Sequence, residues 1–397
     1  MDLKTHQVGV VGAGQLARMA GEAASALGLS MAVLAERPDD AACAVAAEVV
    51  LGSPLVDQDL RALAERCDVL TFDHEQVDLP LLEALVADGV VVRPGIETLE
   101  LAVDKAHMRR ALVEAGVPVP AHHIVDLSTP DSWGAAVEQV GAFGRDHGWP
   151  LVVKAARGGY DGKGVWPADA ATDIERLGSD HPGVYVVEET VPFEAELAVM
   201  VARRPSGEVA TWPAVETAQV GGVCREVLVP GRLPPEVLDQ AAALGRQVAE
   251  IAGAVGVMAV ELFWAGGRLL VNEIAARPHN SGHWTIEGSV TSQFENYLRA
   301  VLDLPLGATA TSYPEVASVN IFGGQAGQDP VAQLALGLAT PGAHIHLYGK
   351  GARPGRKLGH VTVCGNDAEV VRELAWAGAL ALGTPRPVGL ELPAGVA

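Results

Sequence analysis

Two glutamates, Glu261 and Glu273, occur in short apolar segments, Val257–Trp264 and Leu269–Ile274, which the sequence predicts to be neighbouring strands. Because side chains alternate along a strand, a three-residue loop between the segments would set the two carboxylates opposite each other. A two-residue loop would shift the register and turn Glu273 to the other face. Facing carboxylates on an apolar hairpin repel unless a hard cation lies between them. We therefore predict a Mg²⁺ or Mn²⁺ site that carries nucleotide phosphates; two solvated surface acids are the alternative.

A glycine-rich segment follows another predicted strand, Leu151–Val153, which ends in Lys154. A lysine that closes a buried strand needs a polar partner, and phosphate is a common one. Residues 157–164, RGGYDGKG, then contain four glycines among two bases. Such a loop can turn successive N–H groups toward an anion. It matches neither the Walker loop nor the kinase loop, and we interpret it as a phosphate lid rather than a plain hairpin turn.

Two further segments carry polar groups suited to a ligand. The strand predicted at Val184–Val187 leads into residues 188–191, which could present their backbone to adenine, while Glu194 and Glu196 could accept from ribose hydroxyls. The loop that begins at Arg277 packs a cation, an amide and two imidazoles into eight residues, a density that is typical of function rather than packing.

The first hundred residues alternate strands and helices. Gln7–Val11, Met31–Leu34, Val69–Phe72 and Val90–Arg93 are predicted strands, and Gln15–Leu27 and Leu60–Arg66 are predicted helices. This rhythm indicates an open parallel sheet with helices on its faces.

The first turn of this sheet, GAGQLA at residues 12–17, matches a dinucleotide fingerprint with Glu36 as the ribose-binding acid. By itself it would indicate a nicotinamide-dependent dehydrogenase, or tight strand-to-helix packing without a ligand. Gln15, Asp73 and Glu75 follow strand ends, where open sheets bind ligands. The two acids could equally be helix N-caps.

A helix predicted at Leu99–Ala115 carries Lys105, and three prolines after it mark a boundary to a second module. The last module, from about Tyr313, is strand-rich, and its strands at Ile345–Tyr348 and Gly359–Val363 flank a turn with four bases at residues 350–357. In an acidic chain this turn is a candidate phosphate pocket, although a solvated basic turn is the ordinary alternative.

The bulk composition excludes several classes of protein. The chain has 397 residues, 49% of them apolar, and a formal net charge of −21, which disfavours binding of nucleic acid or anionic lipid. Its four cysteines are far apart, its apolar runs are too short for a membrane span, and its N-terminus resembles a first strand rather than a signal peptide. We expect a cytoplasmic globular protein that binds neither nucleic acid nor membranes.

With these residues in view, nearly the whole chain resembles the ATP-grasp enzymes, and among them the members that carboxylate a purine-precursor ribonucleotide. The resemblance rests on GAGQLARM (12–19), GGYDGKG (158–164), VGVMAVELF (255–263), NEIAARPHNSGHWT (272–285) and RPGRKLGH (353–360). It implies an α/β ATP-grasp fold in four parts, which we place at residues 1–104 (pre-ATP-grasp sheet), 105–188 (lid), 189–312 (metal and catalytic part) and 313–397 (small strand-rich domain). It also implies a homodimer whose only partners are the small molecules ATP, bicarbonate and 5-aminoimidazole ribonucleotide.

The resemblance further implies a role for each matching residue. Metal would bind Glu261 and Glu273. ATP would contact Lys105, Lys154, Gly159, Tyr160, Asp161, Gly162, Lys163, Gly164, Val165, Glu188, Glu189, Thr190, Val191, Glu196, Gln219, Asn272 and Glu273. Tyr160, Asp161, Arg277 and His279 would surround bicarbonate and the reacting amine, with Asp161 as a candidate proton acceptor. The imidazole ribonucleotide would contact Gln15, Leu16, Asp73 and Glu75, and its 5′-phosphate would contact Arg353, Arg356 and Lys357.

Three positions depart from the pattern of this family. Ala17 stands where the family often has Gly, Asp73 where it usually has Glu, and Lys163 where many members have Arg. Because Lys lacks the planar fork of Arg, a bidentate contact at position 163 is not expected. Rival interpretations are a formate-dependent transformylase or related ligase of the same fold, the dehydrogenase, and a nucleotide-binding regulator without activity.

Overall fold

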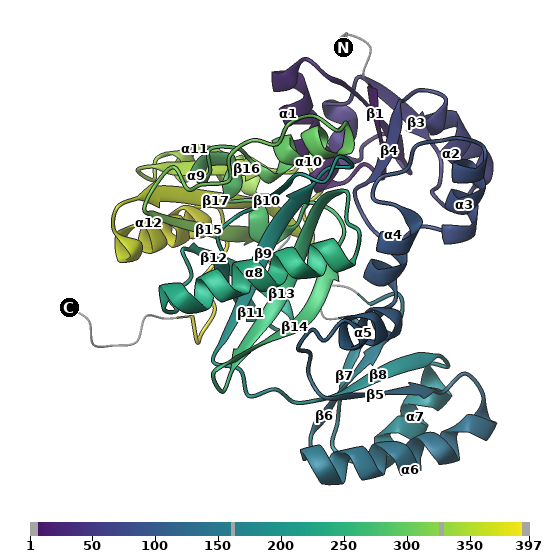
Figure 1. The fold of residues 1–397 in the computed structure, drawn as a ribbon. Helices are drawn as coiled ribbons and strands as arrows, with labels where there is room; N and C mark the ends of the chain where they lie inside the picture. The colour runs from purple at the N-terminus through teal and green to yellow at the C-terminus, as the bar shows by residue number, and fades with distance from the viewer. Residues whose placement is uncertain (1–6, 160–162, 325–328, 391–397) are drawn as a thin grey trace.

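The computed structural model of the protein describes residues 7–159, 163–324 and 329–390, and it begins with a four-stranded parallel sheet (Figure 1). The strand order is β3-β2-β1-β4. The predicted parallel sheet is therefore confirmed, but Val90–Arg93 is not a strand, since only the bridge between Leu70 and Val92 joins it to β4. The elements are β1 Gln7–Val11, α1 Gln15–Leu27, β2 Ser30–Ala35, η2 Ala41–Ala44, β3 Glu48–Leu51, α2 Asp57–Ala64, β4 Val69–Phe72 and α3 Leu79–Ala87.

The helix predicted at Leu99–Ala115 is two helices, α4 Ile96–Val103 and α5 Lys105–Glu114. Asp104 has an extended backbone between them, and its carboxylate accepts from the N–H of His107 at 2.9 Å. A side chain that caps a new helix ends the previous one, so the chain changes direction here. Lys105 thereby begins a helix, and its backbone N–H donates to Ala156.

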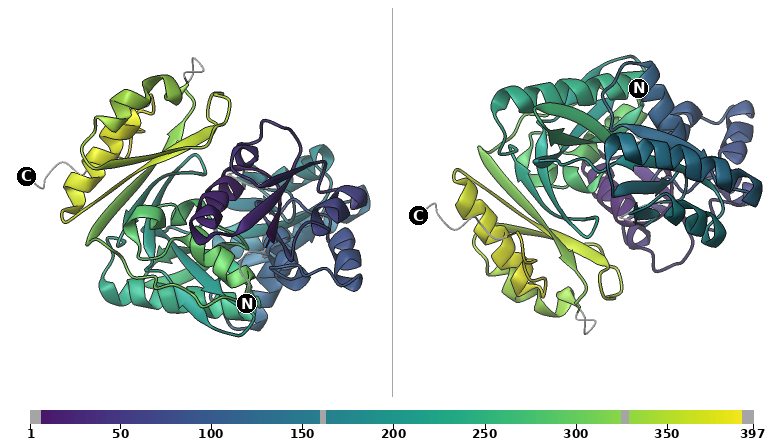
Figure 2. Two further views of the ribbon diagram at one scale, coloured as in Figure 1. Left: turned by 90° about the horizontal axis from the view of Figure 1, so that it is seen from above. Right: turned by 90° about the horizontal axis from the view of Figure 1, so that it is seen from below.

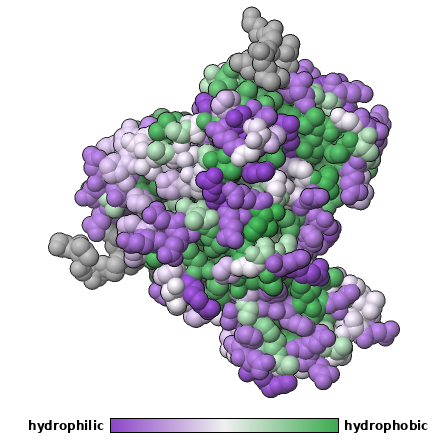
Figure 3. Space-filling model, in the orientation of Figure 1, coloured by the Kyte–Doolittle hydropathy of each residue, from purple (hydrophilic) through white to green (hydrophobic). Residues whose placement is uncertain are grey.

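The next part forms a separate lobe around a four-stranded sheet of order β5-β8-β6-β7. Helices α6 and α7 pack on one face of this sheet, and the lobe projects away from the rest of the molecule, leaving a notch in the space-filling view (Figure 3). The elements are β5 His122–Asp126, α6 Pro130–His147, β6 Leu151–Ala155, β7 Val165–Ala168, α7 Thr172–Asp180 and β8 Val184–Glu189.

A nine-stranded sheet holds the remaining strands, in the order β14-β13-β9-β11-β12-β15-β17-β16, with β10 paired to β9. Helix α8 lies across β9 and β13, whereas α12 covers β15 and β17. The elements are β9 Ala195–Arg203, β10 Val209–Thr211, β11 Val215–Val220, β12 Val223–Val229, α8 Pro235–Ile251, β13 Gly256–Ala265, β14 Arg268–Ala275, η3 Asn280–Gly282, α9 Thr285–Gly288, α10 Gln293–Val301, β15 Glu315–Phe322, η4 Pro330–Gln333, α11 Leu334–Leu338, β16 Ala343–Leu347, β17 Lys357–Gly365 and α12 Ala368–Ala381.

The sheet runs without a break into the C-terminal part, because β12 pairs with β15 in antiparallel register. The yellow C-terminal part and the blue segment that holds α2 and α3 nevertheless lie at opposite ends of the molecule (Figure 2). No helix in the described part of the chain has both the length and the apolar character needed to cross a membrane.

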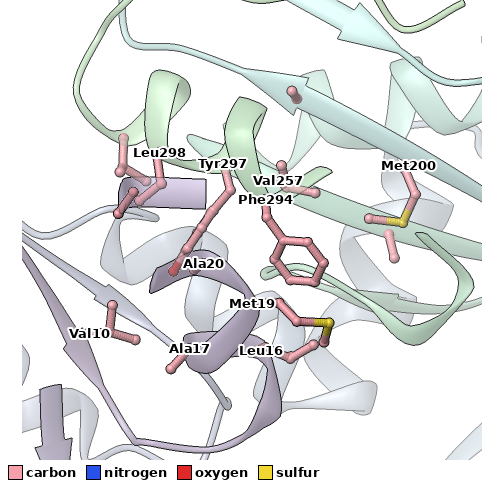
Figure 4. Close-up of a cluster of buried hydrophobic side chains, with 14 of the residues drawn as sticks. Val10, Leu16, Ala17, Met19, Ala20, Met200, Val257, Phe294, Tyr297 and Leu298 are labelled. Atoms are coloured by element: carbon pink, nitrogen blue, oxygen red, sulfur yellow. The ribbon is translucent and has the colours of Figure 1, made fainter. Parts of the chain in front are cut away.

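The N-terminal domain is fixed to the large sheet by a shared hydrophobic core between α1 and α10 (Figure 4). Leu16 and Met19 from α1 pack near Phe294 and Tyr297 from α10. The hydroxyl of Tyr297 also accepts from the backbone N–H of Phe72, at the end of β4. This core sets the carboxyl ends of the parallel strands beside the large sheet.

Candidate active site

The hairpin of β13 and β14 pairs Glu261 with Glu273, as the sequence predicts. The predicted reason was wrong, since the turn has two residues, Gly266 and Gly267, both with positive φ. A β-bulge after Glu261 places Asn272 as the extra residue of β14 and thereby restores the pairing that a two-residue turn would have lost.

The two carboxylates differ in their surroundings. Lys105 donates from Nζ to Oε1 of Glu273 at 2.5 Å. Oε1 of Glu261 lies 3.5 Å from Nε2 of His279. Burial, followed by the charges of Glu273 and Glu196, raises the pKa of Glu261 to about 8. A carboxyl held in this way is suited to a cation, which would favour its ionised form.

A buried ion cluster lies beside the pair. Glu188 is 2% exposed and accepts from Nε of Arg109 and from Nζ of Lys154, each at 2.7 Å. Lys154 also donates to the side-chain oxygen of Asn272 at 2.9 Å, and Arg109 donates to the backbone oxygen of Asn272. Burial opposes the ionised form of Glu188, but its two cations hold the pKa below the ordinary value. Arg109 was not predicted as a site residue, because its partner Glu188 is 79 residues away in the sequence. The local sequence around Arg109 indicates only a charged position on a helix.

One cavity of about 1070 Å³ collects most of the predicted residues. Its lining includes two stacked rings, Phe193 and Phe263, with centroids 4.8 Å apart, which were also not predicted. Glu196 lines it too, and burial raises the pKa of this carboxyl to about 7. The predicted residues in the lining are Glu75, Lys105, Lys154, Gly159, Val165, Glu188, Glu189, Thr190, Val191, Glu196, Gln219, Glu261, Asn272, Glu273, Arg277, His279 and Lys357.

The polar loop after β14 meets the N-terminal domain in this cavity. Arg277 donates from Nε to Oε2 of Glu75 at 2.7 Å, and one of its terminal nitrogens donates to the carbonyl of Pro278. Glu75 is thus no helix cap; it faces the cavity, as one of its two predicted roles requires.

Asp73 accepts hydrogen bonds at the start of α1, which is the helix-capping role considered for it, and its contact with the substrate stays a prediction. Its carboxylate accepts from the backbone N–H of Gly14 at 2.6 Å and of Ala17 at 2.8 Å, at the N-terminus of α1. A Cβ on Gly14 would lie 2.2 Å from Oδ2 of Asp73. The Gly-rich turn therefore holds the protein's own carboxylate where a dinucleotide phosphate would bind, which counts against the dehydrogenase interpretation.

Several predicted contacts lie outside the cavity lining. Leu16 is 7% exposed and belongs to the core. Gln15 accepts from Nζ of Lys350, one of the four bases of the predicted phosphate pocket, so the turn between β16 and β17 reaches α1. Arg356 donates to the carbonyl of Gly351 at 2.9 Å. Also absent from that lining are Lys163, Gly164 and Arg353. Tyr160, Asp161 and Gly162 lie outside the described residues.

Three family models match the chain. They are the ribonucleotide synthetase preATP-grasp domain at residues 5–103, the ATP-grasp domain at 110–294 and the phosphoribosylaminoimidazole carboxylase C-terminal domain at 317–374. The chain is 46% identical over 378 residues to the N5-carboxyaminoimidazole ribonucleotide synthase of Mycobacterium tuberculosis, covering 93% of this chain and 86% of that protein. The chain belongs to the N5-carboxyaminoimidazole ribonucleotide synthase family.

Solved structures of N5-carboxyaminoimidazole ribonucleotide synthases share the whole fold. A carboxyaminoimidazole ribonucleotide synthase from Aspergillus clavatus, complexed with ATP, has a TM-score of 0.86 and 32% identity and covers 96% of this chain and 99% of that one. An Aspergillus clavatus structure in complex with ADP and 5-aminoimidazole ribonucleotide has a TM-score of 0.85 and 31% identity, with 96% and 99% covered. The ATP-grasp fold predicted from the sequence is thereby confirmed.

Proposed function

We propose that the protein joins bicarbonate to 5-aminoimidazole ribonucleotide in an ATP-dependent step of purine biosynthesis, giving N5-carboxyaminoimidazole ribonucleotide, ADP and phosphate. The observation that carries the proposal is the pair of Glu261 and Glu273, which lines one cavity together with Lys105, Lys154 and the loop of Arg277. Enzymes that transfer phosphoryl groups combine carboxylates that bind a metal with lysines that bind phosphates, and this cavity contains both kinds of residue.

The triphosphate would lie between the hairpin and the lid. Lys105 and Lys154 supply positive charge there, and both keep a carboxylate partner, which orients their ammonium groups. Adenine would lie at the end of β8, near Val191, and its ribose would meet Glu196. The glycine-rich lid, with Gly159 in the cavity lining, would cover the phosphates and exclude water.

The residues of the hairpin fit a magnesium ion. Two carboxylates and the side-chain oxygen of Asn272 are hard oxygen ligands. Burial and the charges of Glu273 and Glu196 raise the pKa of Glu261, and a bound cation would offset this cost of ionisation. When bound, the metal would neutralise charge on the phosphoryl oxygens.

The chemistry requires three events in a closed site. A bicarbonate oxygen attacks the γ-phosphorus, ADP leaves, and carboxyphosphate forms; cleavage of carboxyphosphate then releases phosphate and CO₂. The exocyclic amine of the ribonucleotide attacks CO₂ and loses a proton, which leaves the carbamate. Arg277, paired with Glu75, and His279 would bind bicarbonate. Asp161, which lies outside the described residues, would take the amine proton.

The ribonucleotide would lie between the N-terminal domain and the turn that carries Lys357. Glu75 and Lys357 both line the cavity, and the contact of Lys350 with Gln15 brings the basic turn to α1. We assign the 5′-phosphate to this turn, with Arg353, Arg356 and Lys357 as its partners. Leu16 and Asp73 would face the imidazole ribonucleotide at the start of α1, where Asp73 accepts from the N–H of Ala17.

The test is phosphate release from ATP, with bicarbonate and 5-aminoimidazole ribonucleotide added singly and together. We expect full turnover only with both, together with one carbamate per phosphate. Turnover that follows formate instead of bicarbonate would indicate the formate-dependent transformylase.

We also propose that the protein works as a homodimer in the cytoplasm and depends on Mg²⁺, with Mn²⁺ as a substitute. The cysteines at positions 43, 67, 224 and 364 are free thiols, in keeping with a reducing compartment. Light scattering at micromolar concentration tests the dimer, and a single-chain mass would overturn it.

A further inference from the structure

Gln293, the first residue of α10, makes two hydrogen bonds to the backbone of His279. Its Oε1 accepts from the N–H of His279 at 2.9 Å, and its Nε2 donates to the carbonyl of the same residue at 2.8 Å. Gln293 is 0% exposed and does not line the cavity, so it cannot touch a ligand there. A Cβ on Gly282 would lie 2.6 Å from Oε1 of Gln293, which shows how closely the carboxamide packs under the loop.

These two contacts determine which way the carboxamide faces. An oxygen must meet the backbone N–H and the amide nitrogen must meet the carbonyl, so a flipped amide would lose both bonds. The second N–H of Nε2 then meets Nδ1 of His283 at 3.1 Å. Because the amide donates, this Nδ1 must be the unprotonated nitrogen, and His283 takes the Nε2–H form.

His283 is held in turn by the strands that carry the basic turn. It is 1% exposed, its ring centroid lies 5.0 Å from that of His360 on β17, and the edge of Tyr348 packs against it. Nδ1 of His360 shares a hydrogen bond with the hydroxyl of Tyr348 at 2.9 Å. Ring contacts of His283 with Tyr348 and His360, together with the hydrogen bond from Gln293 to His283, thus connect the segment before the basic turn to the loop of His279.

The other end of this chain is the imidazole of His279. Its Nδ1 is engaged by Ser281, through the hydroxyl at 2.9 Å and the backbone N–H at 3.4 Å, so Nε2 carries the proton. That Nε2 lies 3.5 Å from Oε1 of Glu261. The direction of this imidazole depends on the backbone that Gln293 fixes.

We propose that Gln293 and His283 are positioning residues, which hold the backbone of His279 so that its imidazole lies beside the carboxylate pair. The inference rests on the proposed function only for the role of His279 in the reaction. Neither residue touches a substrate; each acts through a hydrogen bond to the next.

The chain offers a matched control on the same helix. Asn296 is also 0% exposed, and its carboxamide also binds the N–H and the carbonyl of a single residue, Gly307, at 2.7 and 3.1 Å. Gln293→Glu and Asn296→Asp make the same change, from an amide nitrogen to a carboxyl oxygen that cannot donate in its ionised form. Only the first should disturb His279.

We expect Gln293→Glu to lower kcat at least tenfold with KM for ATP within about twofold, because misplaced catalytic groups lose rate rather than ATP affinity. Asn296→Asp should lower the thermal unfolding midpoint about as much as Gln293→Glu does. It should nevertheless keep kcat within about twofold of the wild-type value. His283→Asn, which can keep an acceptor oxygen toward Gln293, should retain more activity than His283→Leu.

Hydrogen exchange of the peptide that covers residues 277–284 gives a readout without turnover. It should quicken in Gln293→Glu and not in Asn296→Asp. If the wild-type protein lacks the proposed reaction, the proposed function fails while this exchange result still tests the positioning role. Equal kcat losses in the two variants, or unchanged exchange in Gln293→Glu, would overturn the inference.

Discussion

Replacing Glu261 with glutamine should stabilise the metal-free protein at alkaline pH while removing its metal-dependent activity. Burial and the nearby carboxylates raise the pKa of Glu261 from the ordinary 4.5 to about 8. Between these values the folded state binds more protons at this carboxyl than the unfolded state does. The free energy of unfolding therefore falls as pH rises through this window, and a glutamine removes the effect.

The size of the effect follows from the pKa. A rise from 4.5 to about 8 corresponds to about 5 kcal/mol, at ~1.4 kcal/mol per unit. Because 24% of the side chain is exposed, solvent screens part of this, and we expect a measured gain of ~2 kcal/mol at pH 8.5. At pH 5 the carboxyl is protonated in the folded state, so the two proteins should differ there by less than ~0.5 kcal/mol.

Urea unfolding in the presence of a chelator, at pH 5 and pH 8.5, measures this difference directly. The same variant should lose the stabilisation that MgATP gives the wild type, which is about 2.7 kcal/mol at a hundred times Kd. A Glu261→Gln protein that is less stable than the wild type at both pH values would refute the reasoning, because the ionised carboxyl would then be stabilised by its surroundings rather than destabilised by burial and by the neighbouring carboxylates.

Three further predictions concern ionisable side chains away from the carboxylate pair. Glu188→Gln leaves two cations without their carboxylate and should cost about 3–5 kcal/mol in urea unfolding; a loss below 1 kcal/mol would contradict the ion cluster. Burial lowers the pKa of His283 and His360 well below 6.5, so stability should fall as pH drops below about 6.5, by up to ~1.4 kcal/mol per unit for each imidazole, and His360→Phe should reduce that slope. Asp73→Ala removes the cap of α1 and should cost about 1–2 kcal/mol in thermal unfolding, whereas an unchanged midpoint would argue against the cap.

Local patterns in the sequence were sufficient to predict the helices and strands around the site. Alternation of apolar residues predicted β13 and β14 within one or two residues at each end, and the bounds of β1, α1 and β4 agree with the structure. The pairing of Glu261 with Glu273 was correct although the loop length was not, because the bulge at Asn272 depends on neighbours that local spacing does not reveal.

Features that depend on distant partners were missed. An aspartate such as Asp104 also occurs within helices, so the sequence did not reveal that it caps a new helix. One helix was therefore predicted where there are two. The contact between Arg109 and Glu188 joins a helix to a strand in another lobe, and the carboxylate of Asp73 crosses from β4 to α1. The positions of the strand ends were sufficient to predict where polar side chains gather. Tertiary packing, which the sequence does not show, decides which of these side chains cap a helix and which face the cavity.

The central claim is that bicarbonate is activated by phosphoryl transfer in the cavity between the carboxylate pair and the loop of Arg277. Its most direct test is turnover with ¹⁸O-labelled bicarbonate, followed by mass measurement of the released phosphate. If carboxyphosphate forms, each phosphate carries one oxygen from bicarbonate. Phosphate without label, released during full carboxylation of 5-aminoimidazole ribonucleotide, would contradict the account.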